Sequence, residues 1–141
     1  MIRLIACYGA IAAAMLALDV LWLGLIAKTF YRDAIGHLMA DVPSLAAAAA
    51  FYVVYPLGVL LFAVAPPVWT APGAAPQALP WLRVAGAGAL FGFFAYATYD
   101  LSNLATLREW PWRLALVDIA WGTTLTAAAA AAGRWAWVRM S

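Results

Sequence analysis

Four apolar stretches constrain what this 141-residue chain can fold into more than any other feature of its sequence. They span roughly Leu4–Ala27, Ser44–Ala65, Leu82–Leu101 and Arg113–Ala132. A helix that crosses a bilayer needs about 20 mostly apolar residues, and only 10% of this chain is charged. The stretches are unbroken runs without period-two alternation, so they predict helices and not the strands of a membrane barrel. We therefore expect one all-α transmembrane domain, residues 1–141, built as a four-helix bundle.

The connections between these stretches predict how the helices are arranged. Residues 28–43 are too polar to span a membrane but carry apolar residues at near-helical spacing, which predicts a short amphipathic helix at the interface. Residues 66–81 are rich in proline and are expected to form a non-helical loop. The last connection is short, so the third and fourth spans are expected to be antiparallel neighbours.

The ends of the chain and its charges bear on topology. The first apolar run is longer than that of a signal peptide and offers no small-residue cleavage site, so we expect it to be retained as a span. Basic residues divide equally between the two sides, so the positive-inside rule does not decide the orientation. Asp33, Asp41 and Glu109 all fall on the side opposite the termini, which favours cytoplasmic termini. The basic residues form no cluster, so nucleic acid is not an expected partner.

Three of the six acidic residues, Asp19, Asp100 and Asp118, fall within the predicted spans. A charge at the bilayer centre costs roughly 2.5–3.5 kcal/mol, so such residues face the bundle interior or a water-filled cavity. The 1.5 Å rise per residue puts Asp19, Asp118 and Asp100 about 4, 7 and 12 Å from the midplane, all in the half away from the termini. Tyr52 falls near the depth of Asp19. We expect a carboxylate-lined pocket in that half, with interfacial water as an alternative account of Asp100, the shallowest acid.

Helical phase supports this grouping. Gly88, Gly92, Tyr96 and Asp100 recur every four residues and share one stripe of the third span, with Asn103 on the same side. The glycine half of the stripe resembles a G-x-x-x-G packing seam. The polar half is expected to face the pocket.

The second and fourth spans add further expected features. Tyr52 and Tyr55 are three residues apart, and Pro56 is expected to loosen the backbone by removing one hydrogen bond. Asp118 precedes Gly122 by one turn, which predicts free room beside the carboxylate.

Two short segments repeat faintly in helices of opposite direction. "LDVLW" (residues 18–22) and "VDIAW" (residues 117–121) each carry an Asp with a Trp three residues later. An inverted repeat of the transporter kind is one interpretation. Five residues are too few to establish it.

Several site chemistries are disfavoured. His37 is the only histidine and Cys7 the only cysteine, so we expect neither a zinc site nor bis-histidine haem ligation, and no cofactor. No Ser-His pair is available as a nucleophile and base. "YD" at Tyr99–Asp100 is similar to aspartyl intramembrane proteases, but their glycine-flanked second Asp is missing. Catalytic residues therefore stay unassigned, and whether the protein is an enzyme stays open.

The stretches "LDVLWLGLIAKTFYRDAIGHLM", "AAFYVVYPLGVLLFAV", "GALFGFFAYATYDLSNLATLREWP" and "VDIAWGTTLTA" together resemble a bacterial family of small membrane proteins, domain of unknown function 2177. The resemblance covers nearly the whole chain. It implies four spans, a multi-pass location in the bacterial inner (cell) membrane, and no established activity. Members often lie near genes for methyltransferases similar to cyclopropane-fatty-acid synthases, which hints at membrane-lipid modification.

The resemblance and the spans together give the site residues. The family's polar positions include Tyr31, and our pocket candidates are Asp19, Trp22, Tyr52, Tyr55, Tyr96, Tyr99, Asp100, Asn103, Asp118 and Trp121.

Four accounts of these residues remain open. The leading hypothesis is a pocket that binds or moves a proton, a cation or a small polar ligand. The second is an enzyme that modifies fatty-acyl membrane lipids, or an accessory subunit to one, with the carboxylates as acid and base. The third is a structural subunit, partnered by a second copy or another membrane protein. In the fourth, the acids only tie helices together and fix their register.

Overall fold

The computed structural model describes residues 2–65 and 80–140, and within these ranges every regular element is a helix. The predicted Pro-rich loop at residues 66–81 lies almost entirely outside the described residues. The all-α class predicted from the sequence is confirmed for the described part of the chain. The elements, in chain order, are α1 (Ile2–Leu21) with a π-helical turn (Trp22–Ile26), α2 (Lys28–Ile35) with a 3-10 turn (Gly36–Leu38), α3 (Leu45–Val59) with a second π-helical turn (Leu60–Val64), α5 (Trp81–Thr106) and α6 (Trp112–Arg139).

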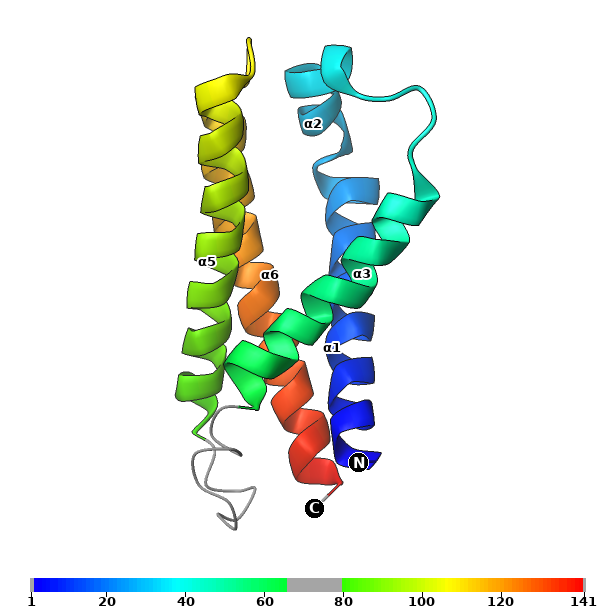
Figure 1. Cartoon of the computed structure of the whole chain (residues 1–141), viewed down its shortest axis with the longest axis vertical. Coiled ribbons are helices and arrows are strands. Elements are labelled where there is room, and N and C mark those ends of the chain that lie inside the picture. Colours follow the sequence, from blue (N-terminus) through cyan, green and yellow to red (C-terminus); the bar gives the residue numbers. More distant parts are fainter. Residues whose placement is uncertain (1, 66–79, 141) are drawn as a thin grey trace.

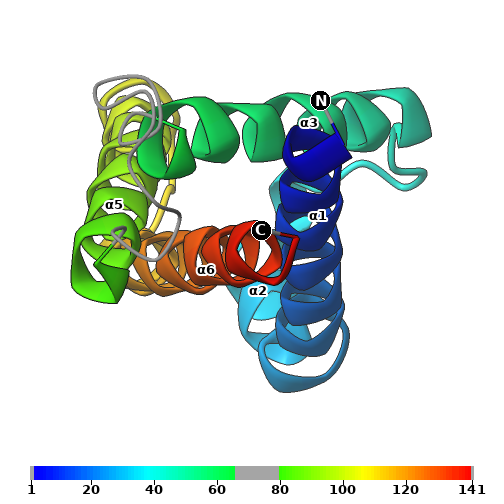
Figure 2. The same cartoon turned by 90° about the horizontal axis from the view of Figure 1, so that it is seen from below.

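The four long helices run alternately up and down, and both termini lie at the same end of the molecule (Figure 1). In Figure 1, α3 runs obliquely in front of α1 and α6 and ends beside α5. Viewed along the long axis, the ribbons of the four long helices have a roughly square outline, with α3 and α6 on opposite sides (Figure 2). The short α2 lies at the end opposite the termini (Figure 1).

Three helical segments in the described residues are long and apolar enough to cross a membrane: Ile2–Ile26, Leu45–Val64 and Trp112–Arg139. α5 has 26 residues but is not one of these three. Its last third carries Asp100 and Asn103 among hydroxyl side chains, which lower its average hydropathy. The structure thus shows three membrane-capable helices, and a fourth span at α5 is a proposal.

The start of α3 agrees with the sequence. Ser44 is the N-cap, and its Oγ accepts a hydrogen bond from the backbone N–H of Ala47 at 3.3 Å. Pro56 lies inside the helix, where it cannot donate the usual backbone hydrogen bond. The π-helical turn begins four residues later, at Leu60. The loosening of the backbone predicted from Pro56 is consistent with this change of winding.

The glycine stripe of α5 packs directly against α6, as the sequence predicts. A Cβ added at Gly88 would lie 2.7 Å from the Cβ of Ala130, and one at Gly92 would collide with the carbonyl of Gly122 and with Thr126. Both positions require a side chain no larger than hydrogen. The absence of side chains here lets the two helices approach closely.

The packed interior lies nearer the end with the termini. Ile11, Met15 and Leu125 are fully buried, and Cys7 Sγ donates a hydrogen bond to the carbonyl of Gly133 at 3.1 Å. At that end the guanidinium of Arg134 stacks over the ring of Trp81, 4.0 Å from its centroid, and other arginines also face tryptophans. Asp19, Asp118 and their tyrosine partners lie toward the opposite end of the bundle.

Two connections meet at the end opposite the termini. His37 Nε2, which follows α2, lies 3.4 Å from Glu109 Oε2 in the turn between α5 and α6. Glu109 adopts a left-handed backbone conformation with φ 63°, which tightens this turn. α5 and α6 are antiparallel neighbours, as predicted (Figure 1).

Candidate functional site

Asp19 of α1 is held by two aromatic side chains from other helices. Tyr52 of α3 donates its hydroxyl to Oδ2 at 3.0 Å, and Trp121 of α6 donates its indole N–H to Oδ1 at 3.3 Å. The side chain of Asp19 is only 5% exposed. This contact puts Tyr52 and Asp19 at the same level of the bundle, as expected from the sequence.

Asp118 of α6 is held in a similar way from α2. Tyr31 donates its hydroxyl to Asp118 Oδ1 in a short hydrogen bond. Trp22, in the π-helical turn after α1, donates its indole N–H to the oxygen of the same tyrosine at 3.3 Å. The short amphipathic helix predicted from the sequence is present as α2, and through Tyr31 it covers the carboxylate.

The two tryptophans join these clusters. The rings of Trp22 and Trp121 stack with centroids 4.4 Å apart and planes 7° from parallel. Each tryptophan is linked to the aspartate of the other segment. Trp121 donates a hydrogen bond directly to Asp19, and Trp22 donates one to Tyr31, which in turn donates to Asp118. The two Asp-Trp segments, which run in opposite directions, are therefore in contact through their tryptophan rings.

Both carboxylates line one cavity. This cavity has a volume of about 310 Å³ and is lined by Asp19, Leu23, Tyr31, Ala48, Phe51, Tyr52, Tyr96, Asp118 and Trp121. α1, α2, α3, α5 and α6 all contribute to the wall.

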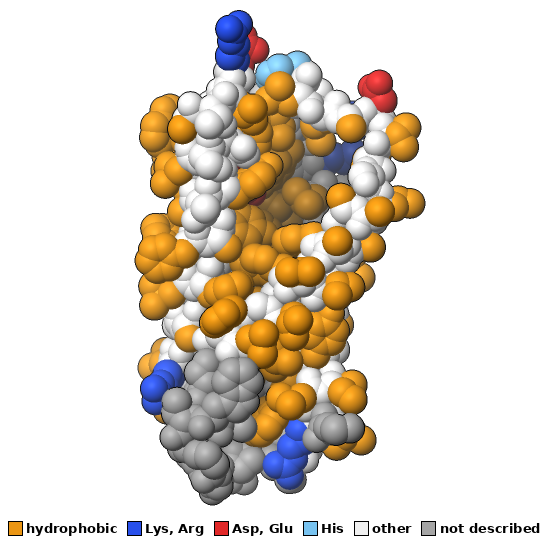
Figure 3. Space-filling view, in the orientation of Figure 1, with side chains coloured by type: hydrophobic (Ala, Val, Ile, Leu, Met, Phe, Trp, Pro, Cys, Tyr) orange, Lys and Arg blue, Asp and Glu red, His pale blue; other side chains and the backbone are white. Residues whose placement is uncertain are grey.

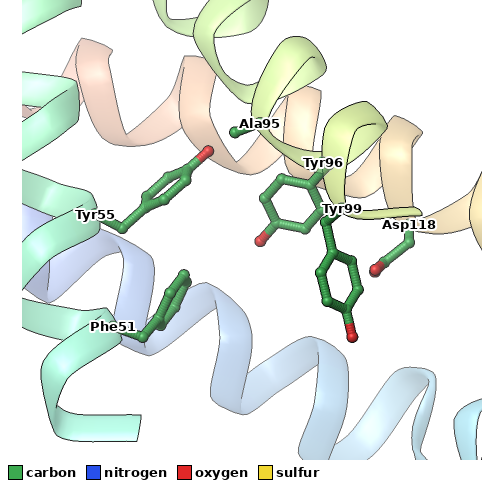
Figure 4. A pocket seen from close by; sticks show the side chains of 6 residues that line it. All are labelled: Phe51, Tyr55, Ala95, Tyr96, Tyr99 and Asp118. Carbon is green, nitrogen blue, oxygen red and sulfur yellow. The ribbon is translucent and has the colours of Figure 1, made fainter. Parts of the chain in front are cut away.

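A second cavity of about 420 Å³ adjoins the first and shares Phe51, Tyr96 and Asp118 with it. Figure 4 shows Phe51 and Tyr55 on α3 facing Tyr96 and Tyr99 on α5, with Asp118 beyond them on α6. We call the two cavities together the carboxylate cleft. It opens on the side of the molecule: Figure 3 shows a hollow between α5 and the part of α3 near α2. Phe51 and Tyr99 are 37% and 54% exposed.

The space beside Gly122 differs from the sequence expectation. A Cβ at Gly122 would overlap the ring of Tyr96, so this ring occupies the room predicted next to Asp118. The lack of a side chain at Gly122 therefore lets the Tyr96 ring pack against α6, where it forms part of the cleft wall. Tyr55 is fixed nearby by Thr126, whose Oγ1 lies 2.9 Å from its hydroxyl.

Asp100 and Asn103 line neither of the two cavities. The side chain of Asp100 is fully buried, and neither of its oxygens has a hydrogen-bond partner in the described part of the chain. Solvation of this residue by interfacial water, one of the sequence-based accounts, disagrees with its burial. The turn before α6 folds back over the end of α5, and Trp110 lies edge-on to Tyr99 at 5.8 Å.

The charge of the cleft is one-sided. Its lining residues include two carboxylates and no lysine or arginine. Outside the apolar spans, burial raises the pKa of Tyr31 well above its usual range, and the hydrogen bond to Asp118 adds to the effect. A neutral phenol at this position can donate its proton to Asp118. Arg113, the arginine closest in sequence to Asp118, lies instead over the ring of Phe30 at 5.6 Å.

The side chains of the cleft do not form a metal-ligand cluster. In residues 2–65 and 80–140, no three His, Cys, Asp or Glu side chains are grouped as metal ligands. The cleft offers two carboxylates, phenols and an indole. These groups can orient and neutralise a positively charged or proton-donating ligand.

Some lining residues are not among the pocket candidates predicted from the sequence. Tyr31 enters only as a polar position of the family, because it falls outside the predicted spans. Phe51 directly precedes Tyr52, and its place in a run of alanines and aromatics gives no signal. Thr126, which contacts the hydroxyl of Tyr55 but lines neither cavity, lies one turn beyond Gly122, and this periodicity could have identified it.

Comparisons with known proteins give one finding. A family model described as "Predicted membrane protein (DUF2177)" matches residues 4–135. No curated protein matches the chain significantly, and no solved structure does so either. Since the family model covers nearly all of the sequence, the chain belongs to this family of predicted membrane proteins.

Proposed function

We propose that the protein binds a small positively charged ligand or a proton in the carboxylate cleft and moves it within or across the membrane. The observation that carries the proposal is the convergence of Asp19 and Asp118 on one cavity, without a basic residue in its lining. Two anions shielded from bulk water are costly unless they are neutralised. A cation or proton taken up by the cleft provides that neutralisation.

The hydrogen bonds around the aspartates support a binding role over a purely structural one. Interhelical hydrogen bonds in membranes contribute on average only about 0.6 kcal/mol, less than the cost of inserting a carboxylate. Asp19 and Asp118 also border open volume and are not sealed into the packed interior. A carboxylate that only joined helices would need no cavity beside it.

The proposed topology has four spans, with α5 as the third. α5 is 26 residues long, enough for about 39 Å at 1.5 Å per residue, and its buried stripe packs along α6. Its polar residues near the end opposite the termini then lie close to the membrane surface. An inner-membrane location with cytoplasmic termini is part of the same proposal.

Flux measurements in proteoliposomes test this function. We expect wild-type protein to carry at least one of protons, K⁺ and methylammonium faster than protein-free liposomes do. Asp19→Asn and Asp118→Asn should each abolish that flux, because each removes one of the two negative charges. Asp33→Asn is the matched control, since Asp33 is exposed and lies outside the carboxylate cleft.

The same variants also give the result that would contradict the proposal. Circular dichroism and gel filtration establish that each variant is folded. If folded Asp19→Asn and Asp118→Asn proteins retain the full wild-type flux, or if wild-type protein carries none of the three probes, transport through the cleft is wrong.

A second function, modification of membrane lipids, is favoured by the lateral opening between α3 and α5 (Figure 3). Through that opening a lipid chain would reach Asp118 and the hydroxyl of Tyr31, which form an acid-base pair. Lipid analysis of a deletion strain tests it. An unchanged acyl-chain and headgroup profile would contradict this alternative and leave the transport proposal intact.

A further inference from the structure

We infer that the ligand of the carboxylate cleft carries a substituted ammonium group, as a free amine or as the headgroup of a lipid. This inference rests on the proposed function, because it names the kind of cation that the same cleft takes. It follows from the aromatic residues in the walls, the hydrogen bonds that the two carboxylates already accept, the volume of the cleft and the position of its opening.

The walls of the cleft are mostly aromatic. Five of the nine residues around the smaller cavity are aromatic: Tyr31, Phe51, Tyr52, Tyr96 and Trp121. The larger cavity adds Tyr55 and Tyr99. Aromatic faces attract cations, and cages of such rings bind quaternary ammonium groups and methylated amines.

The carboxylates are arranged for an organic cation more than for a metal ion. Hard cations such as Ca²⁺ take six or more oxygen ligands. In the cleft, Asp19 already accepts two hydrogen bonds, and Asp118 accepts one from Tyr31. The remaining surface is largely ring carbon, which cannot replace a hydration shell but does pack against methyl and methylene groups.

The volume of the cleft also fits a ligand of several heavy atoms. The cavities measure about 310 and 420 Å³ and share three lining residues, within the range typical of small-molecule pockets. A dehydrated alkali ion would leave most of this space empty. An ammonium group with its substituents fills the region between the aspartates and Phe51.

The opening decides how such a group enters. Phe51 of α3 and Tyr99 of α5 are partly exposed at the side of the bundle, where Figure 3 shows the hollow. A headgroup attached to a lipid can enter from the side, and a free amine can enter from water near α2. The two sources share the same charged group, and only binding measurements with both separate them.

Isothermal titration calorimetry on the purified protein in detergent tests the inference. The probes are tetramethylammonium, ethanolamine, lysophosphatidylethanolamine and K⁺. We expect tetramethylammonium to bind about tenfold more tightly than K⁺, because only the organic cation gains from the rings. Asp19→Asn and Asp118→Asn should each weaken its binding at least tenfold.

Phe51→Leu isolates the aromatic contribution, since Phe51 lines both cavities and leucine keeps an apolar side chain there. We expect it to weaken tetramethylammonium binding about fivefold and to leave K⁺ binding unchanged. Phe94→Leu is the control, because Phe94 is exposed on α5 and lines neither cavity.

The outcomes separate this inference from the proposed function. Aspartate-dependent binding or flux of protons or K⁺, without preference for the ammonium probes, overturns the inference and leaves the function standing. Equal affinity of Phe51→Leu and wild type for tetramethylammonium also overturns it. Absence of aspartate-dependent binding and flux for every probe overturns both. Tighter binding of the lysolipid than of ethanolamine supports a lipid source, and equal binding supports a free amine.

Discussion

Replacement of Gly122 by alanine tests the wall of the carboxylate cleft most sharply. A Cβ at this position would overlap three carbons of the Tyr96 ring, and Tyr96 lines both cavities. Overpacking of this kind costs about 1–3 kcal/mol. The exchange of glycine for alanine in a helix returns about 1 kcal/mol. We therefore expect Gly122→Ala to lower the free energy of unfolding by up to about 2 kcal/mol.

Gly9→Ala is the matched control, because a Cβ at Gly9 would meet no atom within 4 Å. It keeps the helix-propensity gain without the overlap, so its stability should equal or exceed that of the wild type. Unfolding is followed by circular dichroism during titration with sodium dodecyl sulfate in mixed micelles. In a Tyr96→Ala background the penalty of Gly122→Ala should vanish. Equal stability of the Gly122→Ala and Gly9→Ala proteins, or a penalty that persists without the Tyr96 ring, would refute the packing described for this wall.

Three further predictions use the same unfolding titration. Tyr31→Phe removes the donor to Asp118 and should cost about 1.5–3 kcal/mol, the range for hydrogen bonds to charged groups; an unchanged midpoint would contradict that bond. Ser44→Ala removes the N-cap of α3 and should cost about 1 kcal/mol without changing cation affinity, whereas a lost affinity would show that the cap acts on the cleft. Because the pKa of Tyr31 is raised in the folded protein, the folded state keeps this proton where the unfolded state loses it, so stability should fall as the pH rises above about 10. The fall should be shallower in Tyr31→Phe, and identical slopes would contradict the assignment.

The arrangement of the helices follows from local sequence signals. Apolar length predicts the segments Ile2–Ile26 and Leu45–Val64 to within two residues at each end. The helix α6 continues to Arg139, beyond the predicted end at Ala132, through residues 133–139, which include no proline. α5 is not among the three membrane-capable helices, because Asp100, Asn103 and the hydroxyl side chains of its last third lower its hydropathy.

The contacts within the cleft are less accessible to sequence reasoning. Spacing and depth bring Asp19 and Tyr52 together, and the structure confirms this pair. The bond from Tyr31 to Asp118 joins residues 87 positions apart and depends on how α2 folds back, which no local pattern encodes. Asp100 shares the helical stripe of Tyr96 but is fully buried and lines neither cavity. Helical phase predicts the face of a side chain, and the neighbouring segment determines what covers it.

The central claim is that Asp19 and Asp118 give the cleft its negative charge, and thiol labelling measures this directly. Single cysteines replace Ala48 or Ala95, which line the two cavities, in a protein whose buried Cys7 is changed to alanine. Each is labelled with a cationic and an anionic methanethiosulfonate of similar size. The ratio of the two rates reports the local potential. Ala105→Cys, exposed on α5, is the reference site.

We expect the ratio of the cationic to the anionic labelling rate to be higher at both cleft positions than at the reference site. Asp19→Asn should lower the ratio at Ala48→Cys, and Asp118→Asn the ratio at Ala95→Cys, by about 25-fold, because one charge at about 4 Å in a water-like medium changes each rate about fivefold and the two rates change in opposite directions. The ratio at the reference site should stay unchanged. Equal ratios at all three sites, unaffected by either substitution, would contradict the carboxylate cleft.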